Sequence, residues 1–349
     1  MTTVPKTMRA AVMTGLHRVE IRQVPVPAVP PNHVLVRIRA CGVCGSDVHY
    51  FHEGRIGDQV VKGPQVLGHE PAGDVAAVGR GVRRVREGDR VAVEPAFNCK
   101  RCVYCRRGQA NLCTNLLFLG MPGLPGAFQE YLAVPAHCVE IIPPQMPYAI
   151  AALLEPLAIA VHATHLVPDW KGARVAILGA GPIGLSILLC VRAAGASRIF
   201  VSEPIAERRY MARRLGARIA LDPTRENVPD RLLAATRGLG VDIAIEAAGV
   251  PEAWHHAIDG TRKGGRILIA GIPEVDFVPV PAHTARRKEL VIQNVRRSNR
   301  DLARTIDLVK TAVDPSALHT HTFSLEETGK ALELVQQKAD GVVKAIIEP

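Results

Sequence analysis

The segment Val175-Ala-Ile-Leu-Gly179-Ala-Gly181-Pro-Ile-Gly184 decides the fold class, because an apolar run is followed directly by glycines spaced as G-x-G-x-x-G. The run predicts a buried strand, and the uncharged residues after Gly184 predict a helix. The glycines permit a tight turn and a close approach of the backbone to a pyrophosphate, whose charge lies at the helix N-terminus. The motif alone is weak evidence, since glycine-rich turns also form for backbone reasons.

The sequence around the motif supports a dinucleotide site. Apolar runs that predict strands at 175–178, 198–202, 218–221, 241–246 and 266–270 alternate with helical stretches, which is typical of a parallel sheet covered on both faces.

The second of these strands ends at Glu203, nineteen residues beyond Gly184. A carboxylate there can accept both ribose hydroxyls of NAD and repel a 2′-phosphate. Arg208 would instead attract a phosphate, but with Glu203 in place the sequence predicts NAD rather than NADP. The alternative for Glu203 is a surface residue that opens a helix.

The first third of the chain has a different pattern. Short β-type runs at 34–39, 74–78, 90–93 and 131–134 alternate with Gly/Pro turns, and we expect no helix of any length before about residue 149. A strand at 290–295 and a helix at about 302–311 follow the parallel-sheet segment, and a strand at 342–347 could rejoin the β region. The expected fold class is α/β, with a mostly β domain and a doubly wound parallel-sheet domain.

The composition is that of a globular protein of two domains, with 349 residues, 48% hydrophobic and 22% charged. It excludes collagen, coiled coils and wholesale disorder. The net charge of +10 is compatible with nucleic-acid binding. However, the basic residues are scattered in pairs without interleaved aromatics, so we expect a solvated basic surface and no nucleic-acid partner.

The sequence also predicts a cytoplasmic protein without a membrane segment. The uncharged run 175–191, between Arg174 and Arg192, is at the short limit for a bilayer span, and its central glycines and proline fit a strand, a turn and a helix better. The N-terminal apolar run 10–13 is too short for a signal peptide. The cysteine pattern favours a reduced compartment.

Four cysteines follow one another as Cys99-x2-Cys102-x2-Cys105-x7-Cys113 on a loop rich in polar residues and glycine. Four thiolates at this density match a closed, tetrahedral structural zinc site. The alternatives are a chance cluster of free thiols, a disulfide pair in an oxidising compartment, and a nucleic-acid-binding zinc finger, for which no recognition helix is evident.

A second set of potential metal ligands is spread along the chain. Cys44 lies in the glycine-lined segment 41–50, His69 and Glu70 are adjacent, and Glu155 interrupts an apolar run. Singly, these could be a small core residue, a hydrogen-bonded core histidine and a helix-terminal acid. Together they match the Cys, His and carboxylate ligands of a catalytic zinc that keeps one position open for water or substrate.

With these motifs the chain resembles the zinc-dependent medium-chain alcohol dehydrogenases, and within them the polyol dehydrogenases that act on sorbitol and xylitol. The matching segments, which occur in the family's order, are Cys44-Gly-Ser-Asp-Val-His-Tyr50, Gly54-Arg-Ile-Gly57, Val66-Leu-Gly-His-Glu70, Gly88-Asp-Arg-Val-Ala-Val-Glu-Pro95, the four-cysteine loop, Leu154-Glu-Pro-Leu157 and the 179–184 turn. The resemblance implies a GroES-like catalytic domain at 1–150, completed by 286–349, and a Rossmann domain at 151–285.

The resemblance also implies roles for individual residues. Cys44 and His69 would ligate the catalytic zinc, with Glu70 or Glu155 as third ligand and the other carboxylate holding the zinc-bound water. Ser46 would relay the alcohol proton toward the cofactor ribose. The substrate pocket would be lined by Tyr50, Phe118, Glu155 and Arg296. The implied NAD contacts are Gly179, Gly181, Pro182, Ile183, Gly184, Glu203, Arg208, Ala270, Gly271, Ile272, Val295 and Arg296.

Two positions refine the comparison with the family. Alcohol dehydrogenases often have a cysteine where Glu155 stands here, which favours the polyol branch. Arg297 stands where similar polyol dehydrogenases often have an aromatic residue, so the resemblance does not determine the lining of the distal pocket.

The expected reaction is reversible oxidation of a polyol secondary alcohol to a ketose. A catalytic zinc would lower the pKa of the substrate hydroxyl while hydride passes to the nicotinamide of NAD. A second, structural zinc and a homotetramer or homodimer are also implied. The alternatives are a threonine 3-dehydrogenase-like or general secondary alcohol dehydrogenase, and a catalytically silent protein that binds NAD or zinc.

Overall fold

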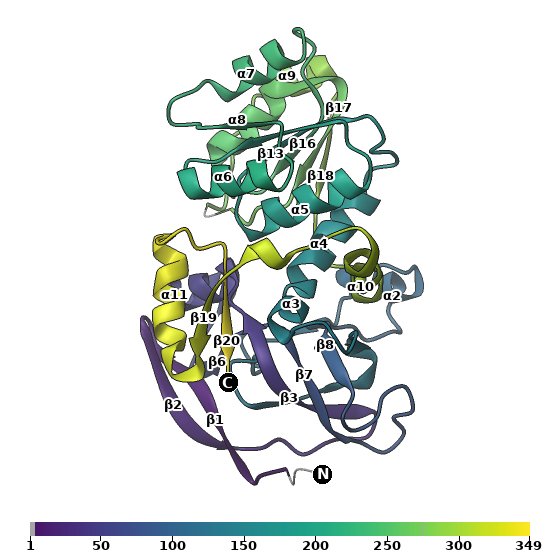
Figure 1. The fold of residues 1–349 in the computed structure, drawn as a ribbon, viewed down its shortest axis with the longest axis vertical. Coiled ribbons are helices and arrows are strands. Elements are labelled where there is room, and N and C mark those ends of the chain that lie inside the picture. Colours follow the sequence, from purple (N-terminus) through teal and green to yellow (C-terminus); the bar gives the residue numbers. More distant parts are fainter. Residues whose placement is uncertain (1–3, 274) are drawn as a thin grey trace. The chain divides into compact units, whose positions relative to one another are not determined.

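The computed structural model describes residues 4–273 and 275–349, and the chain forms two compact units. Unit 1 consists of the chain up to Glu155 together with Leu318–Pro349, and unit 2 is Pro156–Ala317 (Figure 1). The sequence placed the second boundary earlier, at 285/286. Residues 286–317 instead belong to unit 2, because β18 (Val291–Asn294) pairs in parallel with β17 (Thr261–Ile269) as the last strand of its sheet.

The centre of unit 1 is a seven-stranded sheet in the order β12-β8-β7-β3-β20-β19, with β11 also paired to β3. Its strands are β3 (His33–Gly42), β7 (Glu70–Val78), β8 (Arg90–Val93), β11 (Tyr131–Pro135), β12 (Val139–Ile141), β19 (His319–Ser324) and β20 (Lys344–Glu348). In β20, Ile346 and Ile347 pair antiparallel with Gly42 and Cys41 of β3. The C-terminal strand therefore rejoins the β domain, as the sequence predicted.

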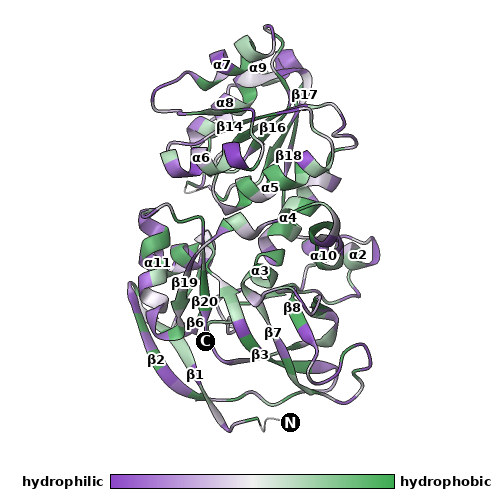
Figure 2. Ribbon diagram, in the orientation of Figure 1, coloured by the Kyte–Doolittle hydropathy of each residue, from purple (hydrophilic) through white to green (hydrophobic). Residues whose placement is uncertain are grey.

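Smaller sheets complete unit 1. A three-stranded sheet has the order β2-β1-β6. Its strands, and those of two further strand pairs, are β1 (Thr7–Gly15), β2 (Arg18–Pro25), β6 (Gln65–Val66), β4 (Arg55–Ile56), β5 (Gln59–Val60), β9 (Ala96–Phe97) and β10 (Leu117–Phe118). Hydrophilic residues colour much of β2, whereas β3 of the large sheet is mainly hydrophobic and buried (Figure 2). One face of β2 therefore meets solvent and the large sheet holds the core.

A nine-residue helix, α1 (Gly45–Glu53), corrects the expectation that no helix precedes residue 149. A capping box links Cys44 and Asp47 at its start, and Gly54 ends it with a left-handed φ of 71°. Val48 and Phe51 are among its buried residues. The sequence pattern hid this helix because its N-cap is a cysteine rather than the usual Ser, Thr, Asp or Asn.

Unit 2 contains a six-stranded parallel sheet in the order β15-β14-β13-β16-β17-β18. The strands not yet given are β13 (Arg174–Leu178), β14 (Arg198–Ser202), β15 (Ile219–Leu221) and β16 (Val241–Glu246). In chain order this arrangement is 3-2-1-4-5-6, the doubly wound dinucleotide-binding topology, in which ligands bind at the carboxyl ends of the strands where the winding reverses. In unit 2 that point lies between β13 and β16.

Helices connect these strands and cover the sheets. They include α2 (Val103–Arg106), α3 (Tyr148–Ala152), α6 (Ala206–Arg214), α7 (Val228–Ala235), α8 (Pro251–Gly260), α9 (Ala282–Lys288) and α10 (Leu302–Thr311). The bounds of α10 match the helix that the sequence predicted.

The apolar run 175–191 divides into most of β13, the glycine turn and most of α5 (Pro182–Ala193), as expected. A different stretch, Tyr148–His165, is long and apolar enough to cross a membrane by length and composition. In the structure 61% of it is buried, as in a core helix of a soluble protein.

A substitution at Gly184 tests the tight packing at the start of α5. A Cβ at Gly184 would lie 1.9 Å from the carbonyl oxygen of Gly179, so we expect Gly184→Ala to lower the free energy of unfolding by about 1–3 kcal/mol. At the helical position Gly329 a Cβ meets nothing closer than Val19 at 4.0 Å, and Gly329→Ala should stabilise by up to ~1 kcal/mol. Urea unfolding measures both; equal effects would contradict the packing argument.

A second prediction concerns Asp242, which accepts hydrogen bonds from Arg174 Nε at 2.8 Å and Arg262 Nε at 2.7 Å. Hydrogen bonding from Arg174, with help from Arg262, holds the pKa of Asp242 well below its usual value. Its contribution to stability is therefore present above the unfolded pKa and is lost as the pH falls.

We expect the free-energy gap between wild type and Asp242→Asn to shrink by about 1 kcal/mol from pH 6 to pH 3, allowing for solvent screening of a partly exposed group. Asp307, whose side chain is 74% exposed, provides the control Asp307→Asn. Equal pH dependence in the two variants would contradict the prediction.

Candidate metal and cofactor sites

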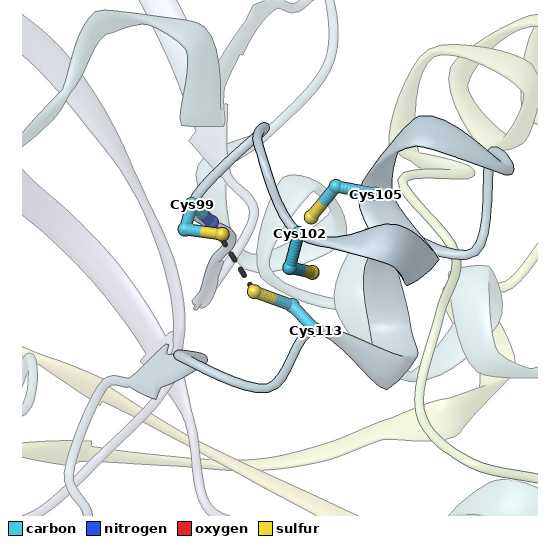
Figure 3. A group of neighbouring side chains, drawn as sticks. All are labelled: Cys99, Cys102, Cys105 and Cys113. Atoms are coloured by element: carbon cyan, nitrogen blue, oxygen red, sulfur yellow. Dashed lines mark hydrogen bonds between the residues drawn. The ribbon is translucent and has the colours of Figure 1, made fainter.

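The four cysteines that the sequence singled out converge in unit 1. One sulfur from each of Cys99, Cys102, Cys105 and Cys113 lies within 4.8 Å of the others (Figure 3). The backbone amide of Cys99 donates to Cys113 Sγ at 3.3 Å, and Asn98 Nδ2 donates to Cys105 Sγ at 3.4 Å. Such hydrogen bonds favour the charged thiolate, the form that binds metal.

The backbone amides of Cys105 and Thr114 lower the pKa of Cys102 to about 5. Hydrogen bonds, led by the amide of Arg101, also lower the pKa of Cys99, whereas burial raises that of Cys113. An all-sulfur set of four ligands fits a closed tetrahedral zinc site. The chemistry of the donors therefore agrees with the sequence prediction.

The structure also brings together the predicted ligands of a catalytic metal. Cys44 is the N-cap residue of α1, and His69 directly precedes β7, whose first residue is Glu70. One ligand atom from each of these three residues lies within 4.8 Å of the others. Gly68 makes the approach possible: its φ is +93°, and a Cβ there would lie 2.6 Å from the ring of Phe128.

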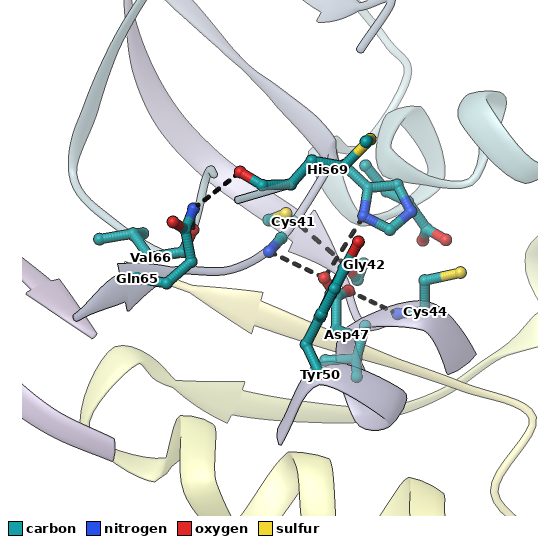
Figure 4. A network of polar contacts seen from close by, with 12 residues as sticks. Cys41, Gly42, Cys44, Asp47, Tyr50, Gln65, Val66 and His69 are labelled. Atoms are coloured by element: carbon teal, nitrogen blue, oxygen red, sulfur yellow. Dashed lines mark hydrogen bonds and ion pairs between the residues drawn. The ribbon is translucent and has the colours of Figure 1, made fainter. Parts of the chain in front are cut away.

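Asp47 orients two of these residues, although its sequence pattern did not mark it as a site residue. Its Oδ1 lies 3.3 Å from His69 Nδ1 and accepts the Gly68 amide at 3.0 Å, while its Oδ2 accepts the Cys44 amide at 3.0 Å (Figure 4). A carboxylate at Nδ1 leaves the Nε2 atom of His69 available for a metal. The signal in the sequence was an acid three residues after the Cys44 cap.

Charges around His69 and Asp47 reinforce each other. Burial favours the neutral imidazole, but the negative charges of Asp47 and Cys44 outweigh it and raise the pKa of His69 well above its usual value. Burial likewise opposes the Asp47 carboxylate, yet His69 and the two amides lower the pKa of Asp47. The centre therefore attracts positive charge.

A buried ion pair links the C-terminal strand to this centre. Lys344 Nζ lies 2.6 Å from Oε1 and 2.8 Å from Oε2 of Glu70 and donates to the carbonyl oxygen of Val43 at 3.0 Å. The Lys344 and Glu70 side chains are 2% and 1% exposed. Burial favours the neutral amine, but the Glu70 charge raises the pKa of Lys344. The sequence did not predict this ion pair; the one feature that could have indicated it is the lone lysine within the apolar run 342–347.

Glu155, unlike Glu70, is a buried carboxylate without an ion-pair partner at its free oxygen in the part of the chain that the structure describes. It lies in the first turn of α4 (Leu154–His165), it is 6% exposed, and its Oε2 has no hydrogen-bond partner among the described residues. Burial raises its pKa to about 8. Glu70 is closer to Cys44 and His69, but both of its oxygens contact Lys344, whereas Glu155 offers an unpartnered oxygen. Both carboxylates therefore suit a role at a bound metal.

The expected substrate residues fall in both units. In unit 1, Phe118 places its ring 5.1 Å from the His69 ring, between centroids. Tyr50 is buried and donates through its hydroxyl to Gln59 Oε1 at 3.2 Å, and Ser46 is half-buried in the first turn of α1. Arg296 is exposed and follows β18 in unit 2.

The glycine-rich turn of unit 2 has the expected geometry. Gly179 has a φ of +109°, and a Cβ there would lie 2.8 Å from the backbone of Ala247, so the turn needs glycine. The third glycine, Gly184, allows α5 to approach β13. By contrast, a Cβ at Gly181 would meet only Arg208 Nη1, at 4.0 Å. The space beside Gly181, at the N-terminus of α5, is open and could receive a pyrophosphate.

Glu203 directly follows β14 and is buried at 4% exposure. Its Oε2 accepts the amide of Ala180 at 2.7 Å, and its Oε1 accepts the amide of Ile205 at 3.1 Å. Arg208 is also buried; burial lowers its pKa while the charge of Glu203 opposes that shift. The carboxylate is thus fixed beside the glycine turn, where it could meet a ribose.

The other residues expected at the cofactor follow β17 and β18, except Pro182 and Ile183, which start α5. The amides of Ala270 and Gly271 donate to the carbonyl oxygen of Glu246 at 2.8 and 3.0 Å, and the amide of Val295 donates to Ile269 at 2.8 Å. Ile272 is 50% exposed. These residues therefore lie at the strand ends, where the topology places ligands.

The chain belongs to the zinc-dependent medium-chain alcohol dehydrogenase family. Residues 30–144 match the alcohol dehydrogenase GroES-like domain and residues 182–311 match the zinc-binding dehydrogenase domain. The chain is therefore an oxidoreductase with a GroES-like and a Rossmann-type domain, of a family that uses zinc and a nicotinamide cofactor.

Relatives and solved structures agree with this family. The sorbitol dehydrogenase of Bacillus subtilis (strain 168) is 36% identical over 99% of both chains. An L-threonine 3-dehydrogenase of Caldanaerobacter subterraneus subsp. tengcongensis is 35% identical over 94% of this chain and 96% of its own. A dehydrogenase structure from Sinorhizobium meliloti 1021 bound to NADP has a TM-score of 0.91, 31% identity and coverage of 99% and 100%. An Escherichia coli CFT073 alcohol dehydrogenase with NADH has a TM-score of 0.91, 29% identity and the same coverage.

A substitution at Lys344 tests the buried ion pair. Lys344→Met leaves the Glu70 carboxylate buried without its partner, so we expect the free energy of unfolding of the zinc-loaded protein to fall by about 3–5 kcal/mol. Lys330, which is 76% exposed in its ion pair with Glu327, provides the matched control Lys330→Met. The control should change stability by less than about 1 kcal/mol. If denaturant unfolding showed equal losses of unfolding free energy in the two variants, the stabilising role of the buried pair would be contradicted.

Proposed function

We propose that this protein catalyses the reversible, NAD-dependent oxidation of a secondary alcohol of a polyol to a ketose. The observation that carries the proposal is the buried Glu155 carboxylate, with one oxygen unpartnered, at the position where related alcohol dehydrogenases often have a cysteine. The similarity to a sorbitol dehydrogenase along 99% of the chain supports the same substrate class.

Two metal sites belong to the proposal. Cys44 and His69 would hold a catalytic zinc, with Glu70 or Glu155 as third ligand, and Cys99, Cys102, Cys105 and Cys113 would hold a structural zinc. When bound, the catalytic zinc would supply Lewis-acid polarisation of the substrate oxygen. Asp47 would keep His69 in the ligating orientation, since a carboxylate at Nδ1 fixes the ring and its tautomer.

The remaining residues would position the substrate and move its proton. Ser46 would pass the alcohol proton toward the cofactor ribose. The hydroxyl of Tyr50 and the guanidinium of Arg296 would meet the other hydroxyls of the polyol, since a buried hydroxyl without a partner is costly. The ring of Phe118, beside His69, would close the apolar side of the pocket.

The cofactor proposal rests on Glu203. Its carboxylate is held beside the glycine turn by the amides of Ala180 and Ile205, where it would accept the ribose hydroxyls of NAD and repel the 2′-phosphate of NADP. Arg208, buried nearby, is the residue that would favour NADP instead. A cytoplasmic location and assembly as a homotetramer or homodimer are further parts of the proposal.

A substrate panel tests the proposed activity. Appearance of NADH is followed with xylitol, sorbitol, 2,3-butanediol and L-threonine, and each substrate is also assayed with NADP. We expect turnover mainly with polyols and NAD, and loss of turnover in Cys44→Ser. Full turnover by zinc-free protein, or turnover chiefly with NADP, would contradict the proposal.

The same assay tests the role of Glu203. Glu203→Ala should raise KM for NAD by about 10-fold or more, because hydrogen bonds to a charged group contribute about 1.5–3 kcal/mol. The change should leave KM for the polyol nearly unaltered. Glu207, which lies in the first turn of α6, provides the control Glu207→Ala.

A second candidate activity is the oxidation of L-threonine. It is favoured by the 35% identity to the L-threonine 3-dehydrogenase of Caldanaerobacter. It predicts turnover with L-threonine and little with polyols. The panel separates the two activities directly.

A further inference from the structure

A third group of potential metal ligands shares no residue with the two centres described above. His17 lies in the turn between β1 and β2, His52 in the last turn of α1, and Glu333 in α11 (Thr328–Gln337). One ligand atom from each lies within 4.8 Å of the others. We propose that these three side chains form a binding site for a divalent transition-metal ion such as Zn²⁺.

The distances within the cluster fit ligands arranged around a common ion. His17 Nδ1 lies 3.5 Å from Glu333 Oε1, and His52 Nε2 lies 3.8 Å from Glu333 Oε2. Two ligands bound at ~2.1 Å to a tetrahedral zinc lie ~3.4 Å apart. Good N–H···O hydrogen bonds are about 2.7–3.2 Å long. Both separations are therefore longer than good hydrogen bonds and close to the spacing of ligands on one metal. The two histidines face different oxygens of Glu333, so the carboxylate would contact the ion from between them through one oxygen or both.

His52 Nε2 adds an independent observation. It is buried and has no hydrogen-bond partner within residues 4–273 and 275–349, although the side chain as a whole is 15% exposed. A buried nitrogen without a partner is costly, and a bound metal would satisfy it. Imidazole nitrogens with one carboxylate are a donor set that zinc and its neighbours in the first transition row accept.

The backbone holds the cluster in place before any ion binds. His17 has a left-handed φ of 57°, and its amide donates to the carbonyl oxygen of Phe51 at 3.0 Å. The His17 and His52 rings meet edge to face, with centroids 4.3 Å apart. The turn between β1 and β2 is thereby fixed beside the end of α1, and little rearrangement is needed for binding.

The cluster also has an entry path. The His17 and Glu333 side chains are 53% and 39% exposed. Three protein ligands would leave a further coordination position open toward solvent, available to water or to an outside ligand. A metal here would join three segments that are far apart in the sequence, the first hairpin, α1 and α11.

Equilibrium dialysis tests the site on the full-length protein carrying its resident zinc. Total bound zinc is measured by plasma emission spectrometry over a series of buffered free Zn²⁺ concentrations. His17→Asn removes one imidazole while keeping a residue that tolerates the left-handed backbone, and Glu333→Gln removes the carboxylate charge without changing the side chain's shape. His283→Ala, at an exposed histidine of α9, is the control.

We expect wild type and His283→Ala to bind one more zinc per chain at saturation than His17→Asn or Glu333→Gln, or to bind that zinc at least ~10-fold more tightly. Circular dichroism and dehydrogenase activity verify that each variant is folded. Equal zinc binding by all four proteins would overturn the proposal and indicate a plain histidine–carboxylate contact. The zinc measurement is independent of substrate and cofactor, because neither is present during dialysis.

Discussion

The proposed catalytic centre depends on the contacts that the Asp47 carboxylate makes with His69 and with two backbone amides. Asp47 is 1% exposed, and its oxygens meet His69 Nδ1 and the amides of Gly68 and Cys44. One side chain thus fixes the start of α1 and the histidine before β7, although Cys44 and Gly68 are 24 positions apart in the sequence. A charge buried this deeply is stable only when such partners surround it. Loss of the Asp47 contacts would therefore displace Cys44 and His69, and displacement of these residues would leave the Asp47 carboxylate without partners.

The C-terminal strand reaches the same place. β20 pairs with β3, and Lys344 of β20 neutralises Glu70 beside Cys44 and His69. This pairing explains why the C-terminal segment belongs to unit 1 while the parallel sheet forms a unit of its own. Strand pairing brings the residues together, and burial of opposite charges then determines which carboxylate is engaged and which, Glu155, keeps an unpartnered oxygen.

Local patterns in the sequence predicted much of this molecule. The glycines at 179, 181 and 184 and the continuous apolar strands identified the parallel sheet, because each signal lies within about ten neighbouring residues. The cysteine spacing likewise predicted the four-sulfur cluster. The contacts of Asp47 and Lys344 and the cluster of His17, His52 and Glu333 depend on residues up to 316 positions apart, which no local pattern encodes. The helix α1 was missed for a different reason, an unusual cap.

Anomalous diffraction at the zinc absorption edge, from crystals of the purified protein, shows directly which residues hold zinc. We expect one peak among the sulfurs of Cys99, Cys102, Cys105 and Cys113 and a second peak next to Cys44 Sγ and the Nε2 atom of His69, the nitrogen that Asp47 leaves free. No peak beside Cys44 and His69 in crystals that show the four-cysteine peak would contradict it.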